Sequence, residues 1–204
     1  MKTISSTKKI SGVLALLLIL TSVVAIAQPV QFTIDTQRSI LSYTGDHRMH
    51  GWTGVSNAVN GTLLIDLEQP ASSRIEIVVP VESFDSGNSN RDSNMLDTVE
   101  SDKYPDVQFV SEEIVVDQWD KTTDGYSGTW RVKGQLTFHG QTQPVEIPVI
   151  VKGGNGSFEA TGEFNISLKA FGVRRPKLLL MPISDEILLA GEIYASSQEY
   201  SNPQ

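Results

Sequence analysis

The chain has 204 residues, no Cys and a formal net charge of −8 at neutral pH. A chain of this length builds one good hydrophobic core rather than two. The negative charge argues against binding to nucleic acid or to anionic lipid head groups, and the lack of Cys excludes disulfides, so the core must supply the stability.

The first 27 residues have the pattern of a secretory signal peptide. Lys at positions 2, 8 and 9 precede the apolar stretch 13–20, and Ala25-Ile-Ala27 places small residues where a signal peptidase cuts. The stretch from residue 13 to residue 27 is shorter than the about 20 apolar residues that span a bilayer. The pattern predicts cleavage after Ala27 and a mature chain with a formal charge of −11, because the removed segment carries three Lys and no acid. We therefore expect a periplasmic or secreted protein with no stable membrane insertion.

After residue 31, apolar and polar residues alternate with the period of two that is typical of β-strands. In the clearest run, residues 73–81, Ile75, Ile77 and Val79 share one face. The alternation returns in four later runs, which turn residues separate; these are residues 130–138, 145–151, 158–168 and 187–195. About eight strands with one apolar face each indicate an antiparallel sandwich or a closed barrel, and the pattern does not decide between them.

The strand rhythm stops between residues 84 and 105. Met95, Leu96 and Val99 have a spacing that places their side chains on one face of a short helix. Pro105 disfavours helix at Tyr104. The sequence therefore predicts a short helical crossover around residues 88–104, packed on an end or a side of the sheet.

Catalytic patterns are weak in this chain. Three His residues, His47, His50 and His139, would suffice in number for a catalytic zinc site. On one strand, however, His47 and His50 would face opposite sides, and hydrogen-bonding His residues at strand ends and turns explain all three. The chain has no Cys and no Gly-x-Ser-x-Gly nucleophile elbow. We therefore predict no metal site, no catalytic residues and no enzyme activity.

Several motifs follow one another in a fixed order. They are the strand 73–81, Arg91-Asp92 with Leu96, Lys103-Tyr-Pro105, the Phe-x-Ser of 109–111, Gly134-Gln-Leu-Thr-Phe-His-Gly140 and Pro144-Val145. In this order, from Phe32 to Tyr194, the sequence resembles the YceI-like family of exported, lipocalin-like barrels, whose known members hold polyisoprenoid or other amphipathic lipids. The resemblance implies an all-β fold, an antiparallel eight-stranded barrel, as a single domain over residues 28–195. Residues 196–204 are polar and are expected to form a flexible tail.

The sequence also departs from the family pattern. Arg38 stands where many members carry a His, and Asn94 replaces the His of the Arg-Asp-x-His-Leu motif, with one residue more before Leu96. Val99-Glu100 replaces a double Phe, and the segment 49–54 is more polar than usual. These changes cluster where a ligand mouth would lie, so the ligand can differ from the polyisoprenoid of the family.

Strand alternation together with the resemblance gives eight candidate residues for the barrel lining. They are Phe109, Trp130, Leu136, Phe138, Ile147, Phe164, Ile166 and Leu189. A register error of one residue would invert the contribution of any strand, and a filled core explains the same residues. Arg91 and Asp92 match the family motif and are expected to latch the crossover by charge-assisted hydrogen bonds, or to contact the head group of a ligand.

The resemblance thus implies a non-catalytic, exported protein that holds an isoprenoid quinone or a similar long-chain amphipathic lipid. No other cofactor and no nucleic-acid partner is expected, and a homodimer is left open. Two alternatives remain. One is a metal-assisted hydrolase that uses His47, His50 and His139, and the other is a packed-core module for envelope stress or interaction without a ligand.

Overall fold

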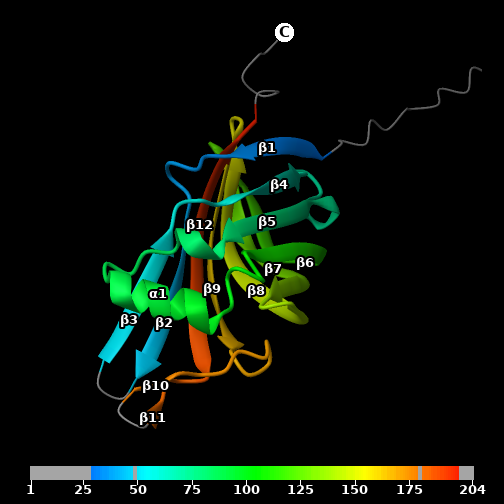
Figure 1. The fold of residues 1–204 in the computed structure, drawn as a ribbon. Helices are drawn as coiled ribbons and strands as arrows, with labels where there is room; N and C mark the ends of the chain where they lie inside the picture. The colour runs from blue at the N-terminus through cyan, green and yellow to red at the C-terminus, as the bar shows by residue number, and fades with distance from the viewer. Residues whose placement is uncertain (1–28, 48–49, 179–180, 198–204) are drawn as a thin grey trace, which may run out of the picture.

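The computed structural model describes residues 29–47, 50–178 and 181–197, which form an antiparallel barrel with one short α-helix (Figure 1). Eight strands close the ring in the order β1-β4-β5-β6-β7-β8-β9-β12, and β1 pairs with β12 to complete it. The all-β, eight-stranded barrel expected from the sequence is confirmed. The expected signal peptide, residues 1–27, lies outside the described residues.

The elements follow one another along the chain with short connections. The strands of the main sheet are β1 (Val30–Ile34), β2 (Ile40–His47), β3 (His50–Ser56), β4 (Asn60–Ile65), β5 (Arg74–Pro80), β6 (Asp106–Thr122), β7 (Gly125–Phe138), β8 (Gln141–Gly154), β9 (Ser157–Ser167) and β12 (Glu186–Ser196). The strands β10 (Lys177–Leu178) and β11 (Met181–Pro182) form a separate small hairpin. The helices are the 3₁₀ turns η1 (Pro70–Ser72) and η2 (Val81–Ser83) and the α-helix α1 (Ser89–Thr98).

The last strand, β12, has two different partners on one side. Its segment 188–192 pairs with β2, whereas Ala195 and Ser196 pair with β1. The hairpin of β2 and β3 therefore extends the wall at the lower end of the ring. Among the described residues, the outer edge of β3 has one isolated backbone bridge to the chain before α1, between Val55 and Asp85, and the Ser56 hydroxyl lies 2.6 Å from the Ser83 hydroxyl. Because strand pairing ends there, α1 and its flanking loop complete the wall on this side.

The helix begins and ends close to where the sequence predicts a crossover. Asn88 is the N-cap, and its side chain accepts a hydrogen bond from the Arg91 N–H at 3.1 Å. The helix ends at Thr98, and Glu100 has a positive φ of 50°. The crossover predicted around residues 88–104 thus holds the short helix, followed by turns at residues 99–103. The turn residues stay attached because Tyr104 N–H donates to Glu100 O at 2.9 Å.

The upper end of the barrel, where β1 lies in Figure 1, is closed by packed aromatic rings. Phe32, Trp130 and Phe158 are each only 1% exposed, and the rings of Phe32 and Phe158 lie 5.9 Å apart. Trp119 packs 5.0 Å from Trp130, and its indole N–H donates to the Leu67 carbonyl at 2.9 Å. Aromatic burial of this kind supplies much of the stability of a small fold without disulfides.

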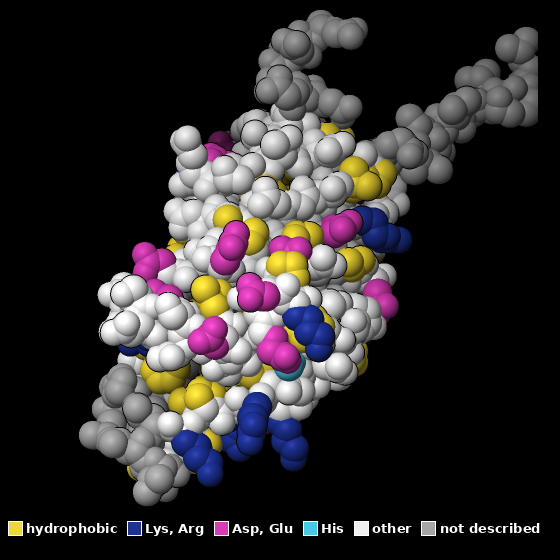
Figure 2. Space-filling view, in the orientation of Figure 1, with side chains coloured by type: hydrophobic (Ala, Val, Ile, Leu, Met, Phe, Trp, Pro, Cys, Tyr) yellow, Lys and Arg dark blue, Asp and Glu magenta, His cyan; other side chains and the backbone are white. Residues whose placement is uncertain are grey.

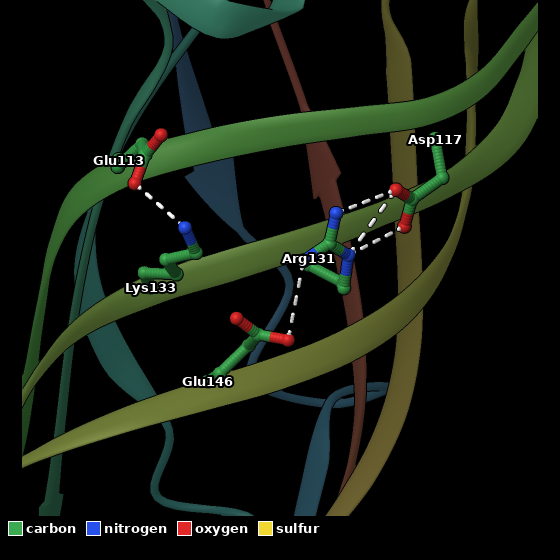
Figure 3. A network of polar contacts seen from close by, with 5 residues as sticks. All are labelled: Glu113, Asp117, Arg131, Lys133 and Glu146. Carbon is green, nitrogen blue, oxygen red and sulfur yellow. Dashed lines mark hydrogen bonds and ion pairs between the residues drawn. The ribbon is translucent and has the colours of Figure 1, made fainter.

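The outward face of the long strands is polar. Arg131 on β7 contacts Asp117 on β6 at 2.9 Å and Glu146 on β8 at 3.4 Å, and Lys133 contacts Glu113 at 2.9 Å (Figure 3). The Asp117 hydrogen bond raises the pKa of Arg131, and Arg131 in turn lowers the pKa of Asp117. Exposed pairs of this kind add little stability each, and here they mark which face of the strands points to solvent.

The chain ends of the domain are partly described. Ser196 is the last residue of β12, and the Ser197 N–H donates to Gly156 O at 2.8 Å. These two residues of the expected tail thus belong to the barrel, and its remainder, residues 198–204, lies outside the described residues. Among the described residues, no helix is long and apolar enough to cross a bilayer.

Candidate ligand-binding cavity

The barrel encloses a cavity of about 870 Å³. Its wall is built by the inward-facing residues of β2 to β9 and β12, together with α1 and the segment around Pro176 and Ile183. Small-molecule sites in proteins have cavities of about 300–1,000 Å³. The cavity therefore has the size of a site for a large organic ligand.

All eight residues predicted to line the barrel lie on the wall of this cavity. They are Phe109, Trp130, Leu136, Phe138, Ile147, Phe164, Ile166 and Leu189. Trp130 lies near the middle of β7 and Phe138 at its C-terminal end, about 27 Å of strand apart at ~3.4 Å per residue. The lining therefore runs along most of the barrel, and the contact of these residues with a ligand stays a prediction.

Side chains do not fill the half of the barrel interior that lies farther from β1. Ile147, Phe164 and Leu189 face the cavity and are apolar, yet each is only half-buried. An inward side chain keeps solvent contact only where it faces open space, because a packed core leaves few voids larger than a water molecule. The cavity contradicts the alternative of a packed-core module.

Two cross-strand pairs of an aromatic residue and a glycine shape the wall on β2 and β3. Tyr43 is paired with Gly54, and Trp52 with Gly45. A Cβ atom on Gly54 would lie 2.3 Å from the Tyr43 ring, and one on Gly45 would lie 2.6 Å from the Trp52 ring. The rings thus lie flat over the glycines, and both line the cavity. The sequence analysis missed these two residues, although glycine and aromatic residues alternate with period two there.

Two buried polar atoms of the wall have no hydrogen-bond partner among the described residues. They are Tyr43 Oη and Trp130 Nε1. The Trp52 indole lies beside the Tyr43 phenol and acts to lower the pKa of Tyr43. Burial raises the pKa of Tyr43, and the Asp92 carboxylate adds to this effect. Because a buried unpaired polar group is costly, both atoms are suited to bind a polar group of a ligand.

Arg91 and Asp92 both hold Ser86 in the loop before α1. Arg91 Nε donates to Ser86 Oγ and Arg91 Nη2 to Ser86 O, each at 2.8 Å. The Ser86 hydroxyl donates to Asp92 Oδ1 at 2.5 Å. Asp92 lies in the first turn of α1, where a negative charge also favours the helix dipole. These bonds have the geometry of the expected latch.

Arg91 and Asp92 differ in their relation to the cavity. Arg91 lines it, whereas Asp92 does not. Among the described residues, Arg91 forms no ion pair with a carboxylate, so part of its guanidinium remains free to contact a ligand. Its contact with a head group stays a prediction.

The cavity opens to solvent next to α1. Most wall residues are buried or half-buried, but Asn94 and Asp97 on α1 and its N-cap Asn88 are exposed, and so are the wall residues Pro176 and Lys177. A wall residue that is also exposed marks where a cavity meets solvent. The mouth therefore lies between α1 and the segment before β10, and its rim is polar.

Of the three His residues, His139 is the one whose side chain the structure describes, and protein groups contact both nitrogens of its ring. His139 Nδ1 lies 2.9 Å from Phe171 O, and its Nε2 lies 2.9 Å from Glu100 Oε2. Both ring nitrogens therefore have protein partners, and the ring ties the β7–β8 turn to the end of the crossover. No group of three or more His, Asp or Glu residues is arranged to hold a metal among the described residues.

The placement of His47 and His50 differs from the expectation. His47 ends β2 and His50 begins β3, and the two are paired directly across the hairpin. The premise that one strand carries both was wrong, because the chain reverses between them. Directly opposed residues of a hairpin share a face of the sheet, but the side chains of both His residues lie outside the described part of the structure.

Comparison with known proteins agrees with this architecture. The family model described as "YceI-like domain" matches residues 32–195. A UPF0312 protein of Yersinia enterocolitica is 28% identical over 193 residues, which cover 89% of this chain and 93% of the relative. A UPF0312 protein of Yersinia pestis is 29% identical over 176 residues, or 81% and 84% of the two chains.

Two solved structures share the fold. BcnA of Burkholderia cenocepacia has a TM-score of 0.70 and 21% identity, with 80% of this chain and 99% of that chain covered. A polyisoprenoid-binding domain from Saccharophagus degradans, implicated in plant cell wall breakdown, has a TM-score of 0.66 and 13% identity, with 82% and 99% covered. At these identities the likeness concerns the fold.

Proposed function

The chain belongs to the YceI-like domain family, and on this premise we propose that it is a non-catalytic binding protein that holds a long-chain amphipathic lipid in its barrel. An isoprenoid quinone or a similar isoprenoid lipid is the ligand class that we favour. The observation that carries the proposal is the cavity of about 870 Å³, whose wall is apolar along the strands and polar at the mouth.

The distribution of polarity along the cavity fits a ligand with one apolar and one polar end. Leu136, Phe164 and Leu189 form an apolar wall, where a hydrocarbon tail gains about 25 cal/mol for each Å² that it removes from water. A tail that buries some hundreds of Å² thus gains several kcal/mol, even after the cost of ordering. Arg91 and Tyr43 lie on the wall near α1, where a polar group would find a cation and a phenol.

The proposal includes the place where the protein acts. The basic, apolar and small-residue pattern of residues 1–27 supports export to the periplasm or the cell exterior. The absence of a nucleophile motif in the sequence and the paired ring nitrogens of His139 support a function in binding rather than in catalysis.

Lipid uptake by the stripped protein tests the proposal. The protein purified from its own envelope is analysed by native mass spectrometry, then delipidated and offered isoprenoid quinones and long-chain lipids. We expect a co-purifying lipid and its re-uptake in a ratio of one per barrel. A folded wild-type protein that takes up none of these lipids would overturn the proposal.

A pair of substitutions separates binding in the cavity from adhesion to the surface. Phe164→Glu puts a charge on the cavity wall, and Ile150→Glu puts the same charge on the outer face, where Ile150 is 61% exposed. We expect Phe164→Glu to abolish uptake and Ile150→Glu to leave it unchanged, with circular dichroism showing that both variants are folded. Equal loss in both variants would contradict a ligand inside the barrel.

A further inference from the structure

One end of this acidic protein is basic. The segment from Lys169 to Lys177, between β9 and β10, contains four Lys or Arg residues and no Asp or Glu. Figure 2 shows Lys and Arg side chains gathered at the lower end of the molecule, with the Asp and Glu side chains of this view placed above them. The charged residues behind the net charge of −8 are therefore unevenly distributed over the molecule.

The fold holds this segment in place. Phe171 and Val173 are buried at 2% and 5% exposure, and the Val173 N–H donates to Leu168 O at 2.9 Å. Arg175 Nη1 donates to Ile183 O at 3.1 Å. With these anchors, the basic residues keep a fixed position relative to the barrel.

Some of the charge is left unpaired. Arg175 lies 3.6 Å from Asp185, which also accepts a hydrogen bond from the Lys169 backbone N–H. Arg174 and Lys177 are exposed and form no ion pair among the described residues. Among the described residues, these two cations thus face solvent without an ion-pair partner and are available to an external anion.

The unpaired cations stand beside the mouth of the cavity. Lys177 and its neighbour Pro176 are both exposed and both line the cavity. The adjoining β10–β11 hairpin presents Met181, which is 36% exposed. The mouth therefore combines exposed cations with an exposed apolar side chain, and Asp97 of α1 is an exposed acid on its rim.

We propose that this end of the barrel docks reversibly on the surface of an anionic lipid bilayer, with the mouth of the cavity toward the membrane. Cations attract anionic head groups, and an apolar side chain next to them can enter the interface. Electrostatic forces reach only about 8–10 Å at physiological ionic strength, so the local charge decides the orientation and the distant acids count little. The expectation from the net charge, that anionic head groups repel the protein, then holds for the rest of the surface.

Binding to vesicles tests the docking surface. The full-length mature protein is sedimented with sucrose-loaded vesicles of phosphatidylcholine, with or without 30 mol% phosphatidylglycerol. We expect binding to the anionic vesicles at low salt, at least about tenfold weaker binding to neutral vesicles, and loss of the difference at about 0.5 M salt. Equal binding to both vesicle types, or none to either, would overturn the proposal, and in the second case an acidic protein becomes the better partner.

Matched charge reversals locate the surface. Arg174→Glu with Lys177→Glu reverses the charge at the mouth, and Lys121→Glu with Lys152→Glu makes the same net change on exposed residues of β6 and β8 near the closed end. We expect the first pair to lower the partition coefficient at least about tenfold and the second at most about threefold. Equal losses would show a response to net charge alone and would contradict docking by this end. The assay needs no ligand in the cavity, so its failure and the failure of the proposed function are distinguishable.

Discussion

The two ends of the barrel use similar apolar residues for opposite purposes. At the closed end, Trp130 and Phe158 are each 1% exposed and pack 6.0 Å apart. At the open end, Phe164 and Leu189 point inward from β9 and β12 but are only half-buried, because they face the cavity. The same kind of side chain thus stabilises the fold at one end and forms a binding wall at the other.

The comparison teaches that inward direction and burial are separate properties. Phe158 and Phe164 lie on one strand, six residues apart, and therefore share a face. Phe158 meets the rings of Phe32 and Trp130, whereas no side chain fills the space in front of Phe164. Whether other side chains fill the interior at the level of a residue decides whether that residue stabilises the fold or lines the cavity.

Truncation of Phe158 and of Phe164 should give the largest difference in stability between the closed and the open end. We expect Phe158→Ala to lower the free energy of unfolding by about 3–5 kcal/mol, because it leaves a void in a packed cluster. For Phe164→Ala in the ligand-free protein we expect a loss of about 1 kcal/mol or less, because few contacts are removed. Urea unfolding followed by circular dichroism measures both values. Equal losses would mean that the interior is packed throughout.

A glycine pair on β3 tests the wall at the open end. Gly54→Ala would place its Cβ 2.3 Å from the Tyr43 ring, whereas the Cβ of Gly51→Ala would meet no atom closer than 3.5 Å. We expect Gly54→Ala to cost about 1–3 kcal/mol of unfolding free energy and to alter the near-ultraviolet signal of Tyr43. Gly51→Ala is the matched control and should cost about 0.5 kcal/mol or less. If both variants behave alike, the ring does not lie over Gly54.

The smallest expected effect concerns Asp185, the acid that holds the basic segment at the open end. The Ser167 hydroxyl, which donates to Asp185 at 2.6 Å, lowers the pKa of Asp185, and the Lys169 N–H and Arg175 act in the same direction. A carboxyl whose pKa is lower in the folded state stabilises the fold above its unfolded pKa of about 3.9. This contribution is lost as the pH falls through the lower folded value.

The matching variant is Asp185→Asn. We expect it to be less stable than the wild type at neutral pH and to approach the wild type as the pH falls below about 4. Thermal unfolding at several pH values measures the difference, and Ser167→Ala should reproduce part of it. A difference that does not depend on pH would show that the carboxylate charge has no role there.

The strands could be predicted from the sequence because each strand of a barrel wall has one face toward solvent and one face toward the interior. Residues such as Leu136 and Ile166 alternate with polar neighbours, so their inward direction follows from the period of two, and the motif order identified the family. The crossover could be predicted from Met95 and Val99, because their helical spacing places both on one face of a helix. Where the helix ends inside the crossover was not predicted, because the turn at Glu100 has no strong local signal.

Other features depend on how the chain folds back on itself, which the period of the residues does not show. The chain reverses between His47 and His50 and pairs them across a hairpin, whereas the sequence predicts one strand there. Trp52 and Tyr43 became wall residues because glycines lie opposite them, and the register decides that. The net charge did not reveal the basic segment, and only the fold shows that Lys177 lies at the mouth.

By itself, the sequence determined the strands, their inward faces and the family, since these follow from local periodicity and the order of motifs. Only the tertiary structure decided that the interior stays open beside Phe164 and closes around Phe158. The physical reason is that a void depends on the sum of side chains that many strands bring to one height of the barrel. No single strand contains that sum, so periodicity predicts direction but not packing.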